Sequence, residues 1–179
     1  MRRRTFLLFT TGFAVMGPTA ARDLPGVALL PDAALGIDDH HWRVIDRTMD
    51  HLFPDERNAP GAGAAHATAW LHNGLRMPEV DDAHRRFIGE GAIDLERLSR
   101  EQEKKSFLEL TTARREAVLR QLELRPGGKA WLQELLRYIL EALLSDPVYG
   151  GNPGGTGWAW LEHRPGFPRP PKEKRYFLL

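Results

Sequence analysis

The chain of 179 residues contains no cysteine. This absence excludes disulfide bonds, cysteine-held iron–sulfur clusters and zinc sites, and covalently attached c-type haem on this chain. Histidine is present, but its spacing does not favour a metal site. His40 and His51 are three helical turns apart, His66 and His72 do not form an i, i+4 pair, and no carboxylate completes a zinc-protease pattern. We therefore expect no metal site on this chain.

The chain also lacks an excess of charge and any stretch in which apolar and polar residues alternate. The formal net charge is +1, and residues 22–179 carry 22 basic against 24 acidic side chains, which does not suggest a nucleic-acid surface. Without period-2 alternation there is no signal for β-strands. A length of 179 residues and an apolar content of 42% fit one globular domain. We predict an all-α fold, a single domain of five to six helices with a long C-terminal loop.

The apolar run from Thr5 to Val15 is too short for a transmembrane helix, which needs roughly 20 apolar residues. Residues 1–21 instead resemble a targeting segment, with a charged start, a mildly apolar run from Thr5 to Val15, and small residues at 18–21. The pair Arg3-Arg4 followed by Thr5-Phe6-Leu7 resembles the twin-arginine export signal. An ordinary secretory signal with an accidental arginine pair is the alternative. Either signal predicts a periplasmic protein.

Periodicity and capping residues divide the rest of the chain. Residues 22–37 are expected to be a linker, 38–168 the helical domain, and 169–179 a basic and aromatic tail that is ordered only if something binds it. Helices are predicted from Asp38 or Asp39 to Leu52, from Ala64 to Leu75, from Asp81 or Asp82 to about Leu98 with a restart capped by Ser99 and Gln102, from Thr111 or Thr112 to Leu124, and from Lys129 to Leu144.

The helix predicted over 129–144 is the most apolar in the sequence. Its charged and amide side chains form only a narrow stripe, so most of its surface is apolar, which is typical of a helix at the centre of a core. The residues expected to face one way are Leu132, Leu135, Leu136, Ile139, Leu140 and Leu143.

The stretch 146–168 cannot form a long helix, because Pro147 ends the preceding helix and five glycines follow. It nevertheless carries four large aromatic side chains, Tyr149, Trp158, Trp160 and Phe167, which need a surface to cover them. Two alternatives stay open for these rings: they anchor a partner, or they form a lid over the last helix. If a helical turn forms at 158–161, the two tryptophan rings point in different directions, so that one faces the core and the other a partner.

Two further patterns do not carry chemistry. The carboxylates Asp46 and Asp50 lie four residues apart, as an acid–base pair could, but arginines on the same helix favour a solvated charged face. The glycines of 150–155 are interrupted by Pro153 and have neither the lysine nor the spacing of a phosphate loop. We expect no catalytic residue and no cofactor-binding residue on this chain.

The stretch 146–168 also carries a family resemblance. The string Asp146-Pro-Val-Tyr-Gly-Gly-Asn152, with Gly157-Trp158 and Pro165-Gly166, closely resembles the C-terminal signature of the gluconate 2-dehydrogenase subunit 3 family. The similarity extends back over most of residues 40–168, through Phe107-Leu-Glu-Leu110, the helix 114–122, and the segments 52–54 and 60–62. The basic and aromatic tail departs from the family.

The resemblance implies a non-catalytic small subunit of a periplasmic dehydrogenase complex that oxidises gluconate or a related sugar. Its partners would be a large subunit carrying FAD and a cytochrome subunit carrying haem c, and any membrane contact would come through that complex. The residues expected at the interface are Tyr149, Gly150, Gly151, Asn152, Gly157, Trp158, Trp160, Pro165 and Gly166. The alternatives are a free-standing periplasmic enzyme or ligand-binding protein with a pocket under the aromatic loop, and a purely structural periplasmic protein.

Overall fold

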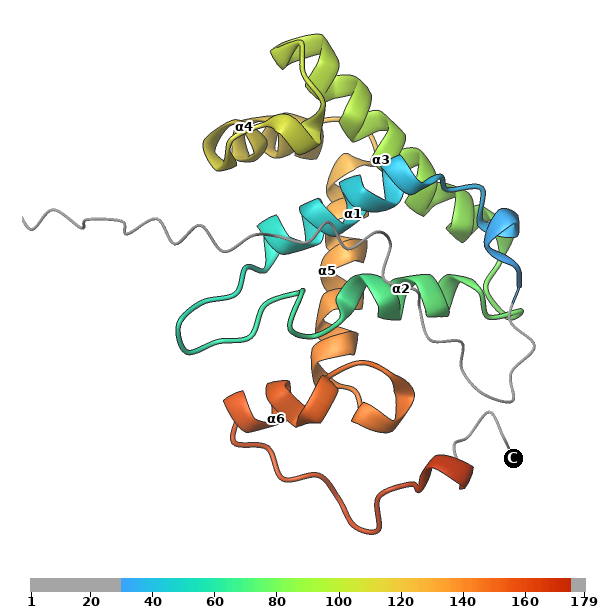
Figure 1. Cartoon of the computed structure of the whole chain (residues 1–179). Coiled ribbons are helices and arrows are strands. Elements are labelled where there is room, and N and C mark those ends of the chain that lie inside the picture. Colours follow the sequence, from blue (N-terminus) through green and yellow to red (C-terminus); the bar gives the residue numbers. More distant parts are fainter. Residues whose placement is uncertain (1–29, 175–179) are drawn as a thin grey trace, which may run out of the picture.

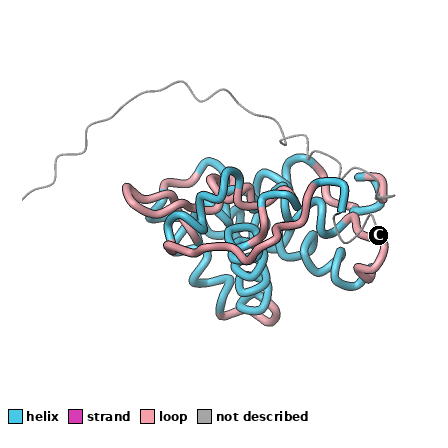
Figure 2. The backbone as a smooth tube through the Cα atoms, turned by 90° about the horizontal axis from the view of Figure 1, so that it is seen from below, coloured by secondary structure: helices cyan, strands magenta, loops and turns pink. Residues whose placement is uncertain are grey.

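The computed structural model describes residues 30–174, and within them the chain forms helices joined by loops (Figures 1 and 2). The export segment with Arg3 and Arg4, the first part of the linker and the last five residues lie outside the described part. The only β-type pairing among the described residues is one bridge between Glu56 and Ala59. The all-α prediction is confirmed. The α-helices are α1 (Asp39–Leu52), α2 (Ala67–Leu75), α3 (Asp82–Glu103), α4 (Thr112–Glu123), α5 (Gly128–Leu144) and α6 (Thr156–Trp160).

The first two helices begin differently. Asp38 caps α1 as the sequence predicts, because its side chain accepts a hydrogen bond from the amide of His41 at 2.8 Å. Helix α2 begins at Ala67, three residues later than expected. The turn before α2 follows the loop after α1, in which the amide of Gly61 donates a hydrogen bond to the carboxylate of Asp55. His66, the residue directly before α2, has left-handed backbone angles.

Helix α3 runs unbroken through Gly89 and Gly91, and the restart predicted at Ser99 is wrong. Ser99 is fully buried inside the helix, and its hydroxyl donates to the carbonyl of Lys105 at 2.9 Å instead of capping a new helix. The capping box lies at Ser106 and Glu109, where it opens a short 3-10 turn, Phe107–Glu109. Gly91 lies under the indole of Trp131 from α5, so this glycine permits close packing between two helices.

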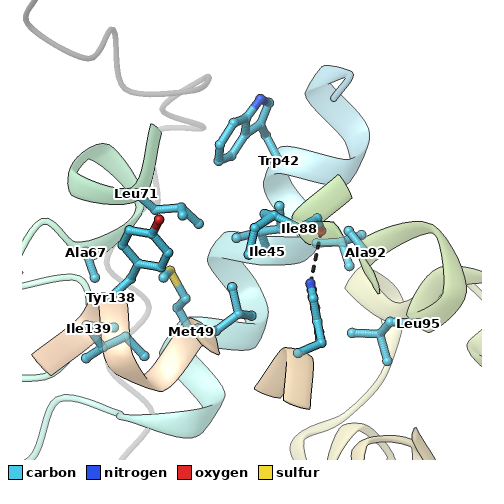
Figure 3. Close-up of a cluster of buried hydrophobic side chains, with 14 of the residues drawn as sticks. Trp42, Ile45, Met49, Ala67, Leu71, Ile88, Ala92, Leu95, Tyr138 and Ile139 are labelled. Carbon is cyan, nitrogen blue, oxygen red and sulfur yellow. Dashed lines mark hydrogen bonds between the residues drawn. The ribbon is translucent and has the colours of Figure 1, made fainter. Parts of the chain in front are cut away.

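Helix α5 is the centre of the fold, and α1, α2, α3, α4 and α6 all contact it (Figure 1). Its inward side chains include Trp131, Leu135 and Ile139, which are at most 1% exposed. Figure 3 shows how the helices converge on one apolar cluster, with Trp42, Ile45 and Met49 from α1, Ala67 and Leu71 from α2, Ile88, Ala92 and Leu95 from α3, and Tyr138 and Ile139 from α5. Burial of this cluster is the main source of stability.

The outward face of α5 is also apolar, which the predicted packing did not anticipate. Leu136 and Leu140 were expected on the buried face, but they are 36% and 41% exposed, and Leu144 is 50% exposed. Trp131 and Tyr138 take their place in the core. Within residues 30–174, no helix combines the length and the apolar character needed to cross a bilayer.

The segment 30–37, placed in the linker by the sequence, packs on the helical domain. It contains a 3-10 turn, Asp32–Leu35, in which Leu35 is only 4% exposed. The backbone of Leu30 donates to the carbonyl of Arg76, and the side chain of Arg76 returns a bond to the carbonyl of Leu30. These contacts hold the start of the described chain against the end of α2.

Candidate functional site

The candidate site lies beyond the end of α5, where residues 146–171 fold into a glycine loop, helix α6 and a strap. The glycine loop comprises residues 150–157, and the strap comprises residues 162–171, which run below α6 in Figure 1. Asp146 lies two residues after the last residue of α5 and caps the 3-10 turn Pro147–Tyr149, because its carboxylate accepts a hydrogen bond from the amide of Val148 at 3.0 Å.

Two glycines seat the loop directly on α5. A Cβ on Gly157 would lie 2.2 Å from the carbonyl oxygen of Leu143, and a Cβ on Gly151 would lie 2.7 Å from the carbonyl oxygen of Ala142. No larger residue fits at either position without moving the backbone. The glycines of the family signature therefore bring α6 against the end of α5.

Asn152 holds the same loop together from inside. It is fully buried and takes left-handed backbone angles, with φ at 48°. Its amide nitrogen donates to the carbonyl of Ser145, its amide oxygen accepts from the backbone of Gly157 at 2.7 Å, and its backbone N–H donates to the carbonyl of Ala65. These polar groups are used within the chain, so they are not presented to a phosphate or a cofactor.

Helix α6 directs its two tryptophans apart, as expected for a helical turn at this place. The half-buried Trp158 donates its indole N–H to the carbonyl of Leu144 at 2.9 Å. Trp160 is 41% exposed, and its ring meets Phe53 edge-on, with 6.3 Å between the ring centroids. Trp158 therefore contacts the end of α5, while Trp160 contacts the loop after α1 and also faces solvent.

The strap is fastened to Trp158 at both of its ends. At the first end, the backbone of His163 donates to the carbonyl of Trp158, and the two rings pack edge to face with 5.7 Å between centroids. At the second end, the guanidinium of Arg169 lies over the Trp158 ring, 5.0 Å from its centroid. The same guanidinium forms two hydrogen bonds with Asp146, Nε to Oδ2 at 2.9 Å and Nη2 to Oδ1 at 2.7 Å.

The charge of Asp146 is stabilised by these contacts. The hydrogen bonds from Arg169 lower the pKa of Asp146, against the opposing effect of partial burial, and the amide of Val148 lowers it further. Asp146 is therefore a carboxylate at neutral pH, with both oxygens engaged. It ties the strap to the helix end and is not available as a general base.

Between its two fastened ends the strap projects outward. Phe167 is 97% exposed. Beside it, the strap and α6 border an open hollow of about 390 Å³. The hollow is lined by Asp146, Trp158, His163, Pro165, Gly166, Phe167, Pro168, Arg169 and Pro170.

The structure distributes the interface residues predicted from the sequence between two roles. Gly151, Asn152 and Gly157 are buried against α5 and shape the loop, whereas Gly150, Trp160 and Gly166 are exposed, and Tyr149, Trp158 and Pro165 are half-buried. Their role in binding a partner stays a prediction. Sequence reasoning counted Phe167 among the large apolar side chains of this stretch but did not place it at the interface, and it did not predict the pairing of Arg169 with Asp146. The Asp-Pro signature and the basic tail were each visible, but nothing in the sequence joins positions 23 residues apart.

Four of the seven histidines link separate elements. His40 faces Glu96, His51 faces Glu116, His72 faces Asp32 and His84 faces Glu134, at 2.8 to 3.3 Å. Each of these pairs joins two different helices or turns. Within residues 30–174, no three acidic or histidine side chains come close enough to hold a metal ion.

Comparison with known protein families identifies a family for this chain. A family model described as gluconate 2-dehydrogenase subunit 3 matches residues 39–166, from the first residue of α1 to the residue before Phe167. No curated protein and no solved structure matches the chain.

Proposed function

The chain belongs to the gluconate 2-dehydrogenase subunit 3 family, and on this premise we propose that it is the non-catalytic small subunit of a periplasmic, FAD-dependent oxidoreductase complex. The complex oxidises gluconate or a related sugar or sugar acid. The observation that carries the proposal is the family match, which spans every described α-helix and the glycine loop. The match confirms the resemblance first seen in Asp146–Asn152.

In this proposal the chemistry belongs to the partners. A large subunit binds FAD and oxidises the substrate, and a cytochrome subunit with haem c passes the electrons on. The small subunit assists the export, folding and stability of the large subunit. The lack of cysteine supports this division for haem c, and the internal use of the Asn152 polar groups supports it for the glycine loop.

The proposed location is the periplasm, reached by the twin-arginine route and next to the inner membrane through the complex. The pair Arg3-Arg4 ahead of a weakly apolar run supports this route. Twin-arginine export carries proteins that are already folded. A small subunit with such a signal can therefore carry a flavin-loaded partner that has none.

The test is purification of an affinity-tagged copy from the native host. We expect a larger polypeptide with a flavin absorbance band to co-purify, and gluconate or sugar oxidation to accompany it. The small subunit purified alone should be colourless. Recovery of the tagged chain alone from cells that grow on gluconate, or stoichiometric flavin on the isolated chain, would overturn the proposal.

The hollow beside Trp158 favours one other function, a free-standing ligand-binding protein. Calorimetric titration of the isolated chain with gluconate and glucose distinguishes the two. The subunit proposal predicts no binding heat, whereas a binding protein gives a saturable signal that is lost in Trp158→Ala.

A further inference from the structure

We infer that the strap is a docking element, and that Phe167 inserts into an apolar pocket with an acidic rim on the flavin-bearing subunit. This inference rests on the proposed function for the identity of the partner. It adds the surface, the anchoring side chain and the chemistry of the opposite face. Phe167 lies just outside the span matched by the family, which ends at residue 166.

The first observation is the combination of exposure with a fixed position. A phenylalanine side chain that is 97% exposed leaves nearly all of its apolar surface in water. Yet the chain on both sides is held, by His163 against Trp158 and by Arg169 against Asp146. Because both ends of the strap are fastened, less conformational entropy is lost when Phe167 enters a pocket.

The second observation is the shape of the surface around Phe167. The hollow of about 390 Å³ lies between the strap and Trp158, so a protruding ring stands next to a concave space of side-chain size. Matching protrusions and hollows are characteristic of protein–protein interfaces, where aromatic residues fill pockets and rings of polar residues exclude water. A fluid lipid surface requires no such shape, so we favour a protein partner over a membrane.

The third observation is the distribution of charge. Residues 30–161 carry 21 acidic and 16 basic side chains, whereas residues 162–174 carry two acidic and four basic ones. The strap itself carries one acidic and two basic side chains, and residues 172–174 add one acidic and two basic ones, so the end of the described chain is a basic segment on an acidic domain. Arg164, near Phe167, is exposed. Complementary potentials favour association, so the pocket that receives Phe167 should be bordered by aspartate or glutamate.

The exposed face of α5 with Leu136, Leu140 and Leu144 also borders a hollow, but these side chains are at most 50% exposed, and the arginine among them, Arg137, is paired with Glu134 and Glu141. Leu124, in the turn after α4, is 79% exposed and does not line the hollow beside Phe167. It belongs to a different part of the fold and has a comparable apolar side chain, so it is a suitable control position.

The experiment places the photoreactive residue p-benzoylphenylalanine at position 167 of the full-length tagged chain in its native host, with position 124 as the control. Irradiation should join position 167, and not position 124, to the flavin-bearing subunit, and peptide mapping should locate the joined pocket next to acidic residues. The docking inference is overturned if position 167 is joined to another polypeptide or to lipid, or if no cross-link forms although the flavin subunit co-purifies. The proposed function stands in each of these cases. Failure of the wild-type chain to co-purify overturns both.

Substitutions then measure the contribution of each part. Phe167→Ala should weaken binding to the separately purified flavin-bearing subunit about 30-fold or more, as for other buried aromatic anchors, while Leu124→Ala stays within about 2-fold. Arg169→Gln keeps the Phe167 ring but releases the strap, so it should raise the Kd by an intermediate factor. The Kd of this variant should also rise less steeply with salt than the Kd of the wild type, because one positive charge is gone. Because Phe167 is almost fully exposed, its variant should unfold at the wild-type temperature. Unchanged affinity in Phe167→Ala, or loss only of binding to vesicles containing phosphatidylglycerol, refutes the inference.

Discussion

The indole of Trp131 occupies the space that a side chain on Gly91 would fill: a Cβ there would lie 2.2 Å from Cδ1 of Trp131. The same indole donates its N–H to the carbonyl of Ile88 at 3.0 Å, so the contact is fixed by a hydrogen bond as well as by packing. At this point α3 and α5 pack so closely that position 91 has room for a glycine but for no larger residue.

Replacing Gly91 by alanine should therefore destabilise the protein, although alanine favours helices. The added methyl group must displace a buried tryptophan, and overpacking of this kind costs about 1–3 kcal/mol. Gly74→Ala is the matched control, because its Cβ would meet only Tyr138, at an ordinary 3.4 Å, and alanine gains up to about 1 kcal/mol in helix propensity. Urea unfolding of both variants checks this. Equal stability of the two would contradict the packing assigned to Gly91.

Glu96 should contribute stability that is lost in acid. Burial raises the pKa of Glu96, but hydrogen bonds from the amide of Phe107 and the hydroxyl of Ser106, with the nearby His40 and Arg100, outweigh burial and lower it. A carboxyl whose folded pKa lies below its unfolded pKa stabilises the fold above the unfolded value, and this stability disappears as the pH falls through the folded pKa.

The variant Glu96→Gln tests this. It should lose about 1–3 kcal/mol at neutral pH, because the buried amide of Phe107 loses a charged acceptor. Its stability should then fall less steeply than that of the wild type between roughly pH 5 and pH 3. Unfolding curves across this range give the two slopes. Parallel slopes would mean that Glu96 is not the group that titrates.

The two tryptophans of α6 should have different effects when truncated. Trp158→Ala removes a hydrogen bond to Leu144 and the ring on which Arg169 rests, so it should lower the stability of the isolated subunit by about 1–3 kcal/mol. Trp160→Ala removes a ring that is 41% exposed and should leave the subunit folded but weaken the complex. Thermal unfolding and binding to the flavin-bearing subunit separate the effects. The assignment is wrong if the two variants behave alike.

Export should depend on the arginine pair at the start of the chain. Arg3→Lys combined with Arg4→Lys keeps the charge but removes the twin-arginine pattern, and should block delivery to the periplasm. A flavin partner without its own signal would then stay in the cytoplasm. Periplasmic dehydrogenase activity at the wild-type level in the double variant would show that an ordinary secretory signal is at work.

Most of the fold could be predicted from the sequence, because helix periodicity and capping are local. Asp38 and Thr111 precede the first residues of α1 and α4 as predicted. Ser99 misled the prediction because a serine and a glutamine three residues apart resemble a capping box wherever they occur. Only the packing of α3 shows that this serine is buried. The outward exposure of Leu136 and Leu140 was missed for a similar reason, since periodicity reveals an apolar face but not what covers it.

The candidate site was less predictable, because its geometry depends on contacts between distant positions. The glycines and tryptophans of 150–160 were visible as a group, and the helical turn of α6 followed from Gly157. The fastening of the strap by Arg169 and Asp146 has no local signal. As a result, Phe167 could be recognised as a positioned side chain only in the folded chain.

The place of α5 at the centre of the core has a consequence for synthesis. A ribosome makes α1, α2, α3 and α4 before it makes the helix on which all four pack. The apolar faces of those helices, such as Leu71 and Ile88, have no α5 to cover them until residues 128–144 have emerged. The protein therefore completes its fold only when most of its chain has been translated. Until then its exposed apolar helix faces can bind chaperones or aggregate with other nascent chains.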